Sequence, residues 1–136
     1  MELFNGAKIV DDRGSVSFVN DFDFAGVKRF YIVENHDKGF VRAWHGHQHE
    51  GKYVYVTRGS AIVGAVKLSS GQLQRYVLSA ANPQVLWIPA GHANGFKTLT
   101  DDTQIMFFST STLTQSQADD IRYPADKWDI WEIEQR

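Results

Sequence analysis

Short runs of alternating or β-branched residues recur through most of the 136-residue chain, and they constrain its fold more than any other feature. Turn-forming Gly, Asn, Asp and Ser residues separate the runs, which follow one another at intervals of roughly 8–12 residues. The runs expected to form strands cover residues 15–20, 27–33, 52–57, 61–68, 73–78, 84–88 and 103–109. Strands at this spacing predict an all-β sandwich or barrel.

Helix signals are sparse, and nothing divides the chain. The sequence predicts a short helix only over residues 114–120, with Ser or Thr as its cap. There is no linker, low-complexity segment or block of like charge, so we expect residues 1–136 to form one domain. The stretch 126–133 carries Trp128 and Trp131, and we expect it to pack instead of fraying.

Composition narrows the classes of function. Hydrophobic residues make up 43% of the chain, but no apolar run reaches the ~18 residues of a membrane span. The net charge of −2 argues against binding to nucleic acid, although a local anion site of a few Arg and Lys stays open. The absence of Cys excludes disulfides and thiolate chemistry, and no secretory signal is visible. We therefore expect a cytoplasmic protein.

Chemistry-bearing residues concentrate in two stretches, residues 39–59 and 87–96. The first holds three histidines within five residues, between Arg42 and Lys52. The two stretches resemble the paired motifs of the cupin superfamily, through Gly39, His45, His47 and Gly59 in the first and Pro89 and Gly91 in the second. The resemblance implies a jelly-roll β-barrel, a fold that holds a small-molecule site in its mouth.

Two departures from these motifs change the expected chemistry. Lys52 stands at the position of the metal-binding Glu, and Asn94 stands at that of the second motif's His. An ammonium offers no lone pair and repels a divalent cation. We therefore expect no metal and no other cofactor; a metal site that uses His49 or His92 would need an altered geometry.

Without a metal, the same residues suit proton transfer. His45, as a neutral imidazole, can take a proton near pH 7. Lys52 can stabilise the oxyanion that results, and Arg13 and Arg42 can clamp phosphates. This set predicts enolisation beside a ketone in a phosphate-bearing substrate.

Four short sequence motifs, in the same order along the chain, resemble those of the dTDP-4-dehydrorhamnose 3,5-epimerase family. They are Asp11-Asp12-Arg13-Gly14, Arg42-Ala43-Trp44-His45, Lys52-Tyr53-Val54 and Ile88-Pro89-Ala90-Gly91-His92-Ala93-Asn94-Gly95-Phe96. The resemblance implies a metal-independent epimerase of a nucleotide-4-keto-6-deoxyhexose, with a product used in surface-polysaccharide or glycosylated-metabolite synthesis. It makes His45 the base, Lys52 the donor to the C4 oxygen, and Arg13, Arg42 and Asn94 substrate contacts. It also implies a homodimer that exchanges N-terminal strands, so that residues 1–20 reach the partner's site.

Two alternatives remain open. The chain also resembles dTDP-4-keto-6-deoxyglucose 3,4-ketoisomerases, through Lys28-Arg29-Phe30-Tyr31 and His45-Gly46-His47. If the protein is such a ketoisomerase, His45 and His47 move protons along one edge of the sugar, with Tyr31 as a candidate acid. Phe107 falls where the epimerases carry their general-acid Tyr, and a Phe cannot donate a proton. This supports a further hypothesis, that the protein is a non-catalytic sugar-binding or metal-binding cupin. Trp44 is expected to stack on the nucleotide base or to line the pocket.

Overall fold

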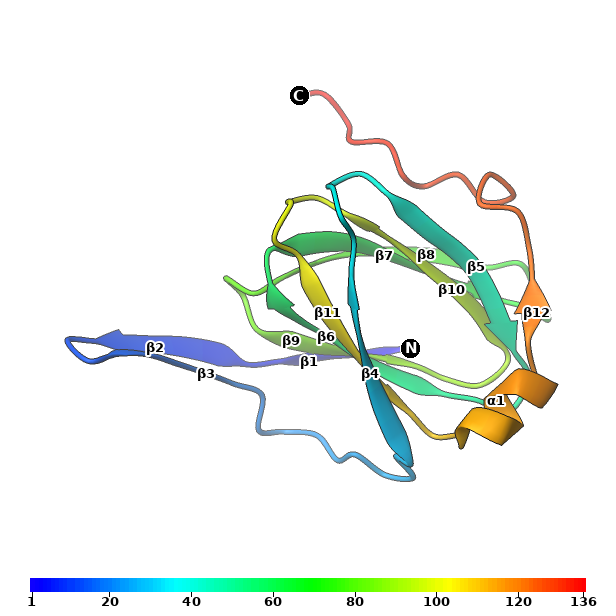
Figure 1. Ribbon diagram of the computed structural model, residues 1–136, viewed down its shortest axis with the longest axis horizontal. Coiled ribbons are helices and arrows are strands. Elements are labelled where there is room, and N and C mark those ends of the chain that lie inside the picture. Colours follow the sequence, from blue (N-terminus) through cyan, green and yellow to red (C-terminus); the bar gives the residue numbers. More distant parts are fainter.

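Two five-stranded antiparallel sheets make up most of the computed structural model, which describes residues 1–136 (Figure 1). The first sheet has the order β1 (Glu2–Asn5), β9 (Gln84–Ile88), β6 (Lys52–Arg58), β11 (Gln104–Ser109), β4 (Arg29–Glu34). The second has the order β12 (Ile121–Arg122), β5 (Val41–His47), β10 (His92–Thr98), β7 (Ser60–Lys67), β8 (Leu73–Ser79). The expected all-β barrel is confirmed.

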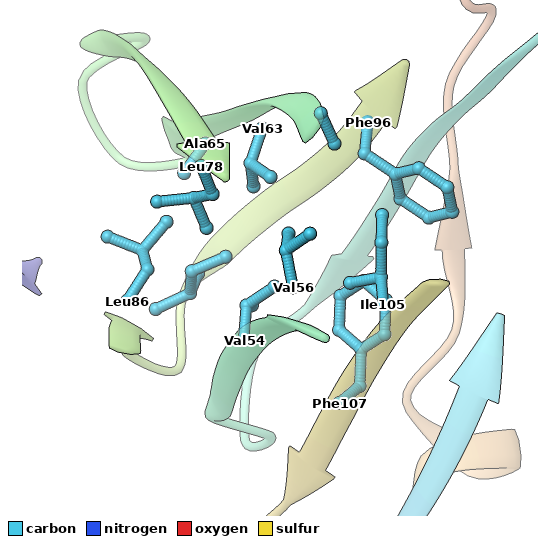
Figure 2. Packing of buried hydrophobic residues seen from close by; sticks show 11 residues of the cluster. Val54, Val56, Val63, Ala65, Leu78, Leu86, Phe96, Ile105 and Phe107 are labelled. Atoms are coloured by element: carbon cyan, nitrogen blue, oxygen red, sulfur yellow. The ribbon is translucent and has the colours of Figure 1, made fainter. Parts of the chain in front are cut away.

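The core lies between the inner faces of the two sheets. Period-two alternation sends every second side chain inward. Figure 2 shows the labelled members of this cluster, which are Val54, Val56, Leu86, Ile105 and Phe107 from the first sheet and Val63, Ala65, Leu78 and Phe96 from the second. Burying a Val, Leu, Ile or Phe side chain stabilises the fold by roughly 1.5–3 kcal/mol. The apolar packing leaves one end of the barrel for polar residues.

Each expected run overlaps a strand, but the residue pattern did not predict strands β1, β2 (Ala7–Asp11), β5, β10 and β12. Strands β5 and β10 contain the histidine stretches, and each has an internal Gly and several polar residues. They form because β10 pairs with β7 on one side and with β5 on the other. Tertiary pairing overrides weak local propensity here.

The helix and the tail close one side of the barrel. Helix α1 (Leu113–Ala118) begins one residue before the expected segment and ends two residues earlier. It starts with a capping box in which the Thr112 hydroxyl accepts from the backbone N–H of Gln115. With six residues, it is too short and too polar to cross a bilayer. The expected packing of the tail is confirmed, since Trp128 and Trp131 both contact the ring of Trp44.

An N-terminal hairpin extends away from the barrel (Figure 1). Strands β2 and β3 (Gly14–Phe18) pair only with each other, and every residue of β2 is exposed. Exposed apolar side chains gather on this arm, at Ile9, Val10 and Val16. The arm therefore contributes almost nothing to the packing of its own barrel.

Candidate active site

A pocket of about 310 Å³ opens between the two sheets beside α1. The first sheet contributes Arg29, Tyr31, Val33, Lys52 and Phe107, and the second contributes Arg42, His45, His47, Asn94, Phe96 and Arg122. A larger depression, about 570 Å³, lies under the C-terminal tail and contains neither His nor Lys. Most of the predicted site residues meet in the inter-sheet pocket, which makes it the candidate site.

An irregularity in β5 brings Arg42 and His45 to the same face. A spacing of three residues puts side chains on opposite faces of a regular strand. The register shifts between these positions, because Phe96 pairs with Arg42 whereas Asn94 pairs with His45. Strand β5 therefore carries one more residue than β10 over this interval, as in a β-bulge. Both Arg42 and His45 line the pocket as a result.

Lys52 projects into the barrel from the start of β6. Its side chain is buried, and its Nζ donates a hydrogen bond to Oδ1 of Asn94 on the facing sheet, at 3.2 Å. Burial lowers the pKa of Lys52 to about 8, although the nearby Glu50 carboxylate opposes this shift. Tyr53 faces the other way, as alternation predicts, and packs on Trp87. The pocket therefore contains an amine that gives up its proton more readily than an ordinary lysine.

His45 lines the same pocket from the sheet that faces Lys52. It is half-buried on β5, and Arg122 of β12 is its direct cross-strand neighbour. Burial, followed by the positive charges of Arg122 and Lys52, lowers the pKa of His45 to about 4. The imidazole is therefore neutral at physiological pH and has a lone pair available for a proton.

His47, which lines the pocket, forms a polar cluster with the buried Glu50. Nδ1 of His47 lies 2.6 Å from the backbone oxygen of Asp119 and 3.2 Å from Oε2 of Glu50. Burial, followed by the charge of Lys52, lowers the pKa of His47. Glu50 also accepts from Arg29 at 3.1 Å and from two hydroxyls, those of Ser109 and Ser116. A fully buried carboxylate is thereby held by four donors.

Tyr31 and Phe107 stack on the wall opposite His45. Their ring centroids are 5.1 Å apart with an interplanar angle of 12°. The guanidinium of Arg29 lies 5.1 Å from the centroid of the Tyr31 ring. Burial, reinforced by the negative charge of Glu50, raises the pKa of Tyr31. The phenol therefore keeps its proton at neutral pH and can donate it.

Three arginines give the pocket a positive potential. Arg42 donates to Oδ1 of Asn35 at 2.7 Å, and Arg122 donates to Oδ1 of Asp120 at 2.7 Å. Arg29 is the third, anchored by Glu50. With Lys52, these arginines outnumber Asp120, the one acidic residue that lines the pocket, and clefts with an excess of one sign of charge concentrate ligands of the other sign. The pocket is suited to an anionic ligand.

Sequence reasoning missed three of these residues, Arg29, Arg122 and Glu50. Arg29 had a usable signal, since it lies two positions before Tyr31 in a strand and so shares its face. Arg122 belongs to a two-residue strand, and Glu50 lies in the connection between β5 and β6. Neither position follows a periodic pattern that could have predicted its place.

Two predicted substrate contacts lie outside the pocket of this chain. The expected role of Trp44 is corrected, because its ring is buried among Trp128 and Trp131 and its Nε1 donates to the backbone oxygen of Ala125. Arg13 lies on the exposed arm and pairs with Asp11 at 2.6 Å. A role for Arg13 in substrate binding would require the pocket of a second subunit, and it stays a prediction.

The donor set does not fit the divalent metal that cupin motifs often hold. No group of three or more His, Cys, Asp or Glu side chains is placed to bind one ion. Lys52, at the position of the carboxylate ligand, points its ammonium into the barrel, where it bonds to Asn94. A positive charge among the imidazoles opposes cation binding.

The barrel and the polar groups at its mouth are the architecture that the cupin resemblance implied, and sequence comparison gives the family. The sequence profile of the dTDP-4-dehydrorhamnose 3,5-epimerases matches residues 3–134. The chain belongs to the dTDP-4-dehydrorhamnose 3,5-epimerase family.

Individual relatives and solved structures are similar to this chain. The dTDP-4-dehydrorhamnose 3,5-epimerase of Escherichia coli is 30% identical over 118 residues, which cover 74% of this chain and 63% of that protein. The solved epimerase of Sulfolobus tokodaii is 26% identical, with a TM-score of 0.80 over 97% of this chain and 81% of that chain. A 3,4-ketoisomerase of Thermoanaerobacterium thermosaccharolyticum, solved with TDP, has the same fold, with 19% identity and a TM-score of 0.70 over 90% of this chain and 86% of that one. The chain spans 50% to 63% of the length of the curated relatives that it matches.

Proposed function

We propose that this chain is a metal-independent epimerase of a nucleotide-4-keto-6-deoxyhexose, with dTDP as the nucleotide. The observation that carries the proposal is the placement of a neutral imidazole, His45, and a buried ammonium, Lys52, on facing walls of one pocket. Membership in the epimerase family supports the same reaction.

His45 acts as the base in this reaction. The C–H bond beside the ketone breaks, the proton moves to the imidazole, and the electron pair moves onto the ketone oxygen as an enolate. The Lys52 ammonium stabilises that negative charge as it develops. A pKa of about 8 leaves Lys52 mostly protonated at pH 7, so that it donates to the enolate oxygen.

Tyr31 donates its own phenolic proton to the opposite face of the carbon, while the abstracted proton stays on His45 and both residues are reset by exchange with solvent. Inversion at carbon requires a base on one face of the sugar and an acid on the other. His45 belongs to the second sheet and Tyr31 to the first, so the sugar lies between them. The acid of the epimerases falls at Phe107 by resemblance, and the Tyr31 ring stacks directly on Phe107. Tyr31 thus supplies a hydroxyl beside the position where Phe107 has none.

The arginines and Asn94 bind the substrate. Arg42 and Arg122 lie near the pocket mouth, where their guanidinium groups pair with the diphosphate of the nucleotide. Asn94, fixed by Lys52, contacts the sugar. The nucleotide reported in the solved ketoisomerase, TDP, is of the same chemical class.

A homodimer completes the proposal. The arm formed by β2 and β3 exposes Ile9, Val10 and Val16 and has no packing partner in its own chain. Exchange of this arm between two subunits would cover these side chains and bring Arg13 to the partner's pocket. We retain the expected cytoplasmic location.

One observation favours a second candidate, a 3,4-ketoisomerase. His45 and His47 line the pocket from the same strand, so both lie on one wall. Moving a ketone between adjacent carbons through an enediol needs proton transfers along a single edge of the sugar. The likeness in fold to a 3,4-ketoisomerase is compatible with this reading.

Product analysis separates the candidates. The purified protein is incubated with dTDP-4-keto-6-deoxyglucose, and the product is examined by NMR. Inversion at C3 or C5 supports the epimerase, whereas migration of the ketone to C3 identifies a ketoisomerase. No change in the sugar would leave a binding protein, and stoichiometric metal in the purified protein would overturn the metal-independent mechanism.

A further inference from the structure

Glu50, a fully buried carboxylate next to the pocket, has no role in the mechanism proposed above. Its side chain is fully buried, yet it lies between two residues that line the pocket, Arg29 and His47. Burying an ionised carboxylate is costly unless donors surround it. Here Ser109 and Ser116 complete the set of donors. Four donating side chains thus offset the cost of burying the Glu50 carboxylate.

The contacts of His47 define which of its ring nitrogens carries the proton. Nδ1 faces the Glu50 carboxylate and the backbone oxygen of Asp119, and both of these groups only accept hydrogen bonds. Nδ1 is therefore protonated in the neutral imidazole, which leaves the lone pair on Nε2. Every fully buried side-chain nitrogen and oxygen in the molecule has a hydrogen-bond partner. Nε2 of His47 has none, so it is not fully buried, and His47 lines the pocket.

We propose that Glu50 is a positioning residue that locks His47 with its proton on Nδ1 and presents the lone pair of Nε2 to the substrate. His47 is then a second proton-transfer group beside His45. The inference rests on the proposed function and deepens it, because it supplies an acceptor for a second proton transfer. The carboxylate acts only through His47.

The charges around His47 explain why it needs this support. Lys52 faces it from β6 and opposes its protonation, and His45 lies on its own strand. Glu50 and Asp119 favour protonation. In this second transfer, which follows proton abstraction by His45, Nε2 takes a proton from a carbon beside the ketone, and the C–H electron pair passes to the ketone oxygen. The imidazolium so formed then has the Glu50 carboxylate 3.2 Å from its Nδ1.

The tautomer can be measured without substrate, by ¹⁵N–¹H correlation NMR of the protein labelled at His. We expect the neutral ring of His47 to be protonated at Nδ1, with His47→Gln identifying its signals. A ring protonated at Nε2 would overturn the proposal. This result is independent of whether the enzyme is an epimerase, a ketoisomerase or a binding protein.

The Glu50→Gln variant tests the role of the charge. It keeps the size and an oxygen acceptor but removes the negative charge, so His47 should titrate at a lower pH. With the substrate turned over by wild type, kcat should fall on the order of 10²-fold, with KM nearly unchanged. Glu34→Gln is the matched control, because Glu34 is an exposed carboxylate that pairs with Arg58 outside the pocket.

Two outcomes would contradict this role for Glu50. An unchanged His47 titration in Glu50→Gln would show that the carboxylate does not act through His47. A rise in KM at constant kcat would show that it acts through Arg29 and substrate binding. If Glu50→Gln does not fold, the tautomer of wild-type His47 still decides the proposal.

Discussion

The ammonium of Lys52 lies 3.2 Å from Oδ1 of Asn94, and this contact joins the two sheets across the inside of the barrel. Both side chains are buried. The contact puts a charged group where a barrel of this size normally has apolar packing or a ligand. Its cost in stability and its use in catalysis both follow from this position.

The first prediction concerns stability. The pKa of Lys52 is about 8 in the folded protein and near 10.5 when unfolded, so the unfolded chain binds more protons between these values. The free energy of unfolding should therefore rise with pH across this window, by about 3 kcal/mol from this group. Lys52→Met should be more stable than wild type at pH 7, with the difference shrinking toward pH 10.5. Urea unfolding of both proteins checks this; parallel pH profiles would contradict it.

The second prediction is the pH dependence of kcat/KM. The base form of His45 is lost below its pKa of about 4, and the acid form of Lys52 is lost above its pKa of about 8. The rate should rise through the first value, stay level near neutrality and fall through the second. Initial rates with saturating and limiting substrate define the profile. A rate that stays constant from pH 7 to pH 10 would remove Lys52 from the mechanism.

The third prediction separates acid from base. Tyr31→Phe removes the hydroxyl but leaves the stack on Phe107 and the contact with Arg29. The variant should still exchange the proton beside the ketone with solvent while forming inverted product at least tenfold more slowly. Tyr76→Phe is the control, because that hydroxyl bonds to Gln74 outside the pocket. Inversion at the wild-type rate in Tyr31→Phe would assign the acid to another group.

The fourth prediction concerns the arm. Val16 is 65% exposed and pairs with Ile9 on the hairpin. A buried charge at an interface is costly, so Val16→Glu should convert a dimer of the 15.4-kDa chain to a monomer. Sedimentation equilibrium at several concentrations measures the change. A wild-type protein that sediments as a monomer would contradict the exchanged arm and, with it, a shared site that uses Arg13.

Alternation was enough to predict that Lys52 and Tyr53 point to opposite sides, because β6 pairs with β9 in regular register over these residues. It failed in β5, where the bulge turns Trp44 into the packing of the tail and brings Arg42 and His45 together. A bulge depends on the strand opposite, which one strand's sequence does not contain. Glu50 could not be predicted either, since its donors come from four separate parts of the chain.

Proton abstraction by His45 is the central claim, and the most direct measurement is solvent-deuterium incorporation into dTDP-4-keto-6-deoxyglucose, followed by NMR in D₂O. Wild type should incorporate deuterium at a carbon beside the ketone, and His45→Ala should abolish this exchange. His36→Ala, on the exposed loop between β4 and β5, is the control and should exchange like wild type. Exchange at the wild-type rate in His45→Ala, or none in wild type, would contradict the account.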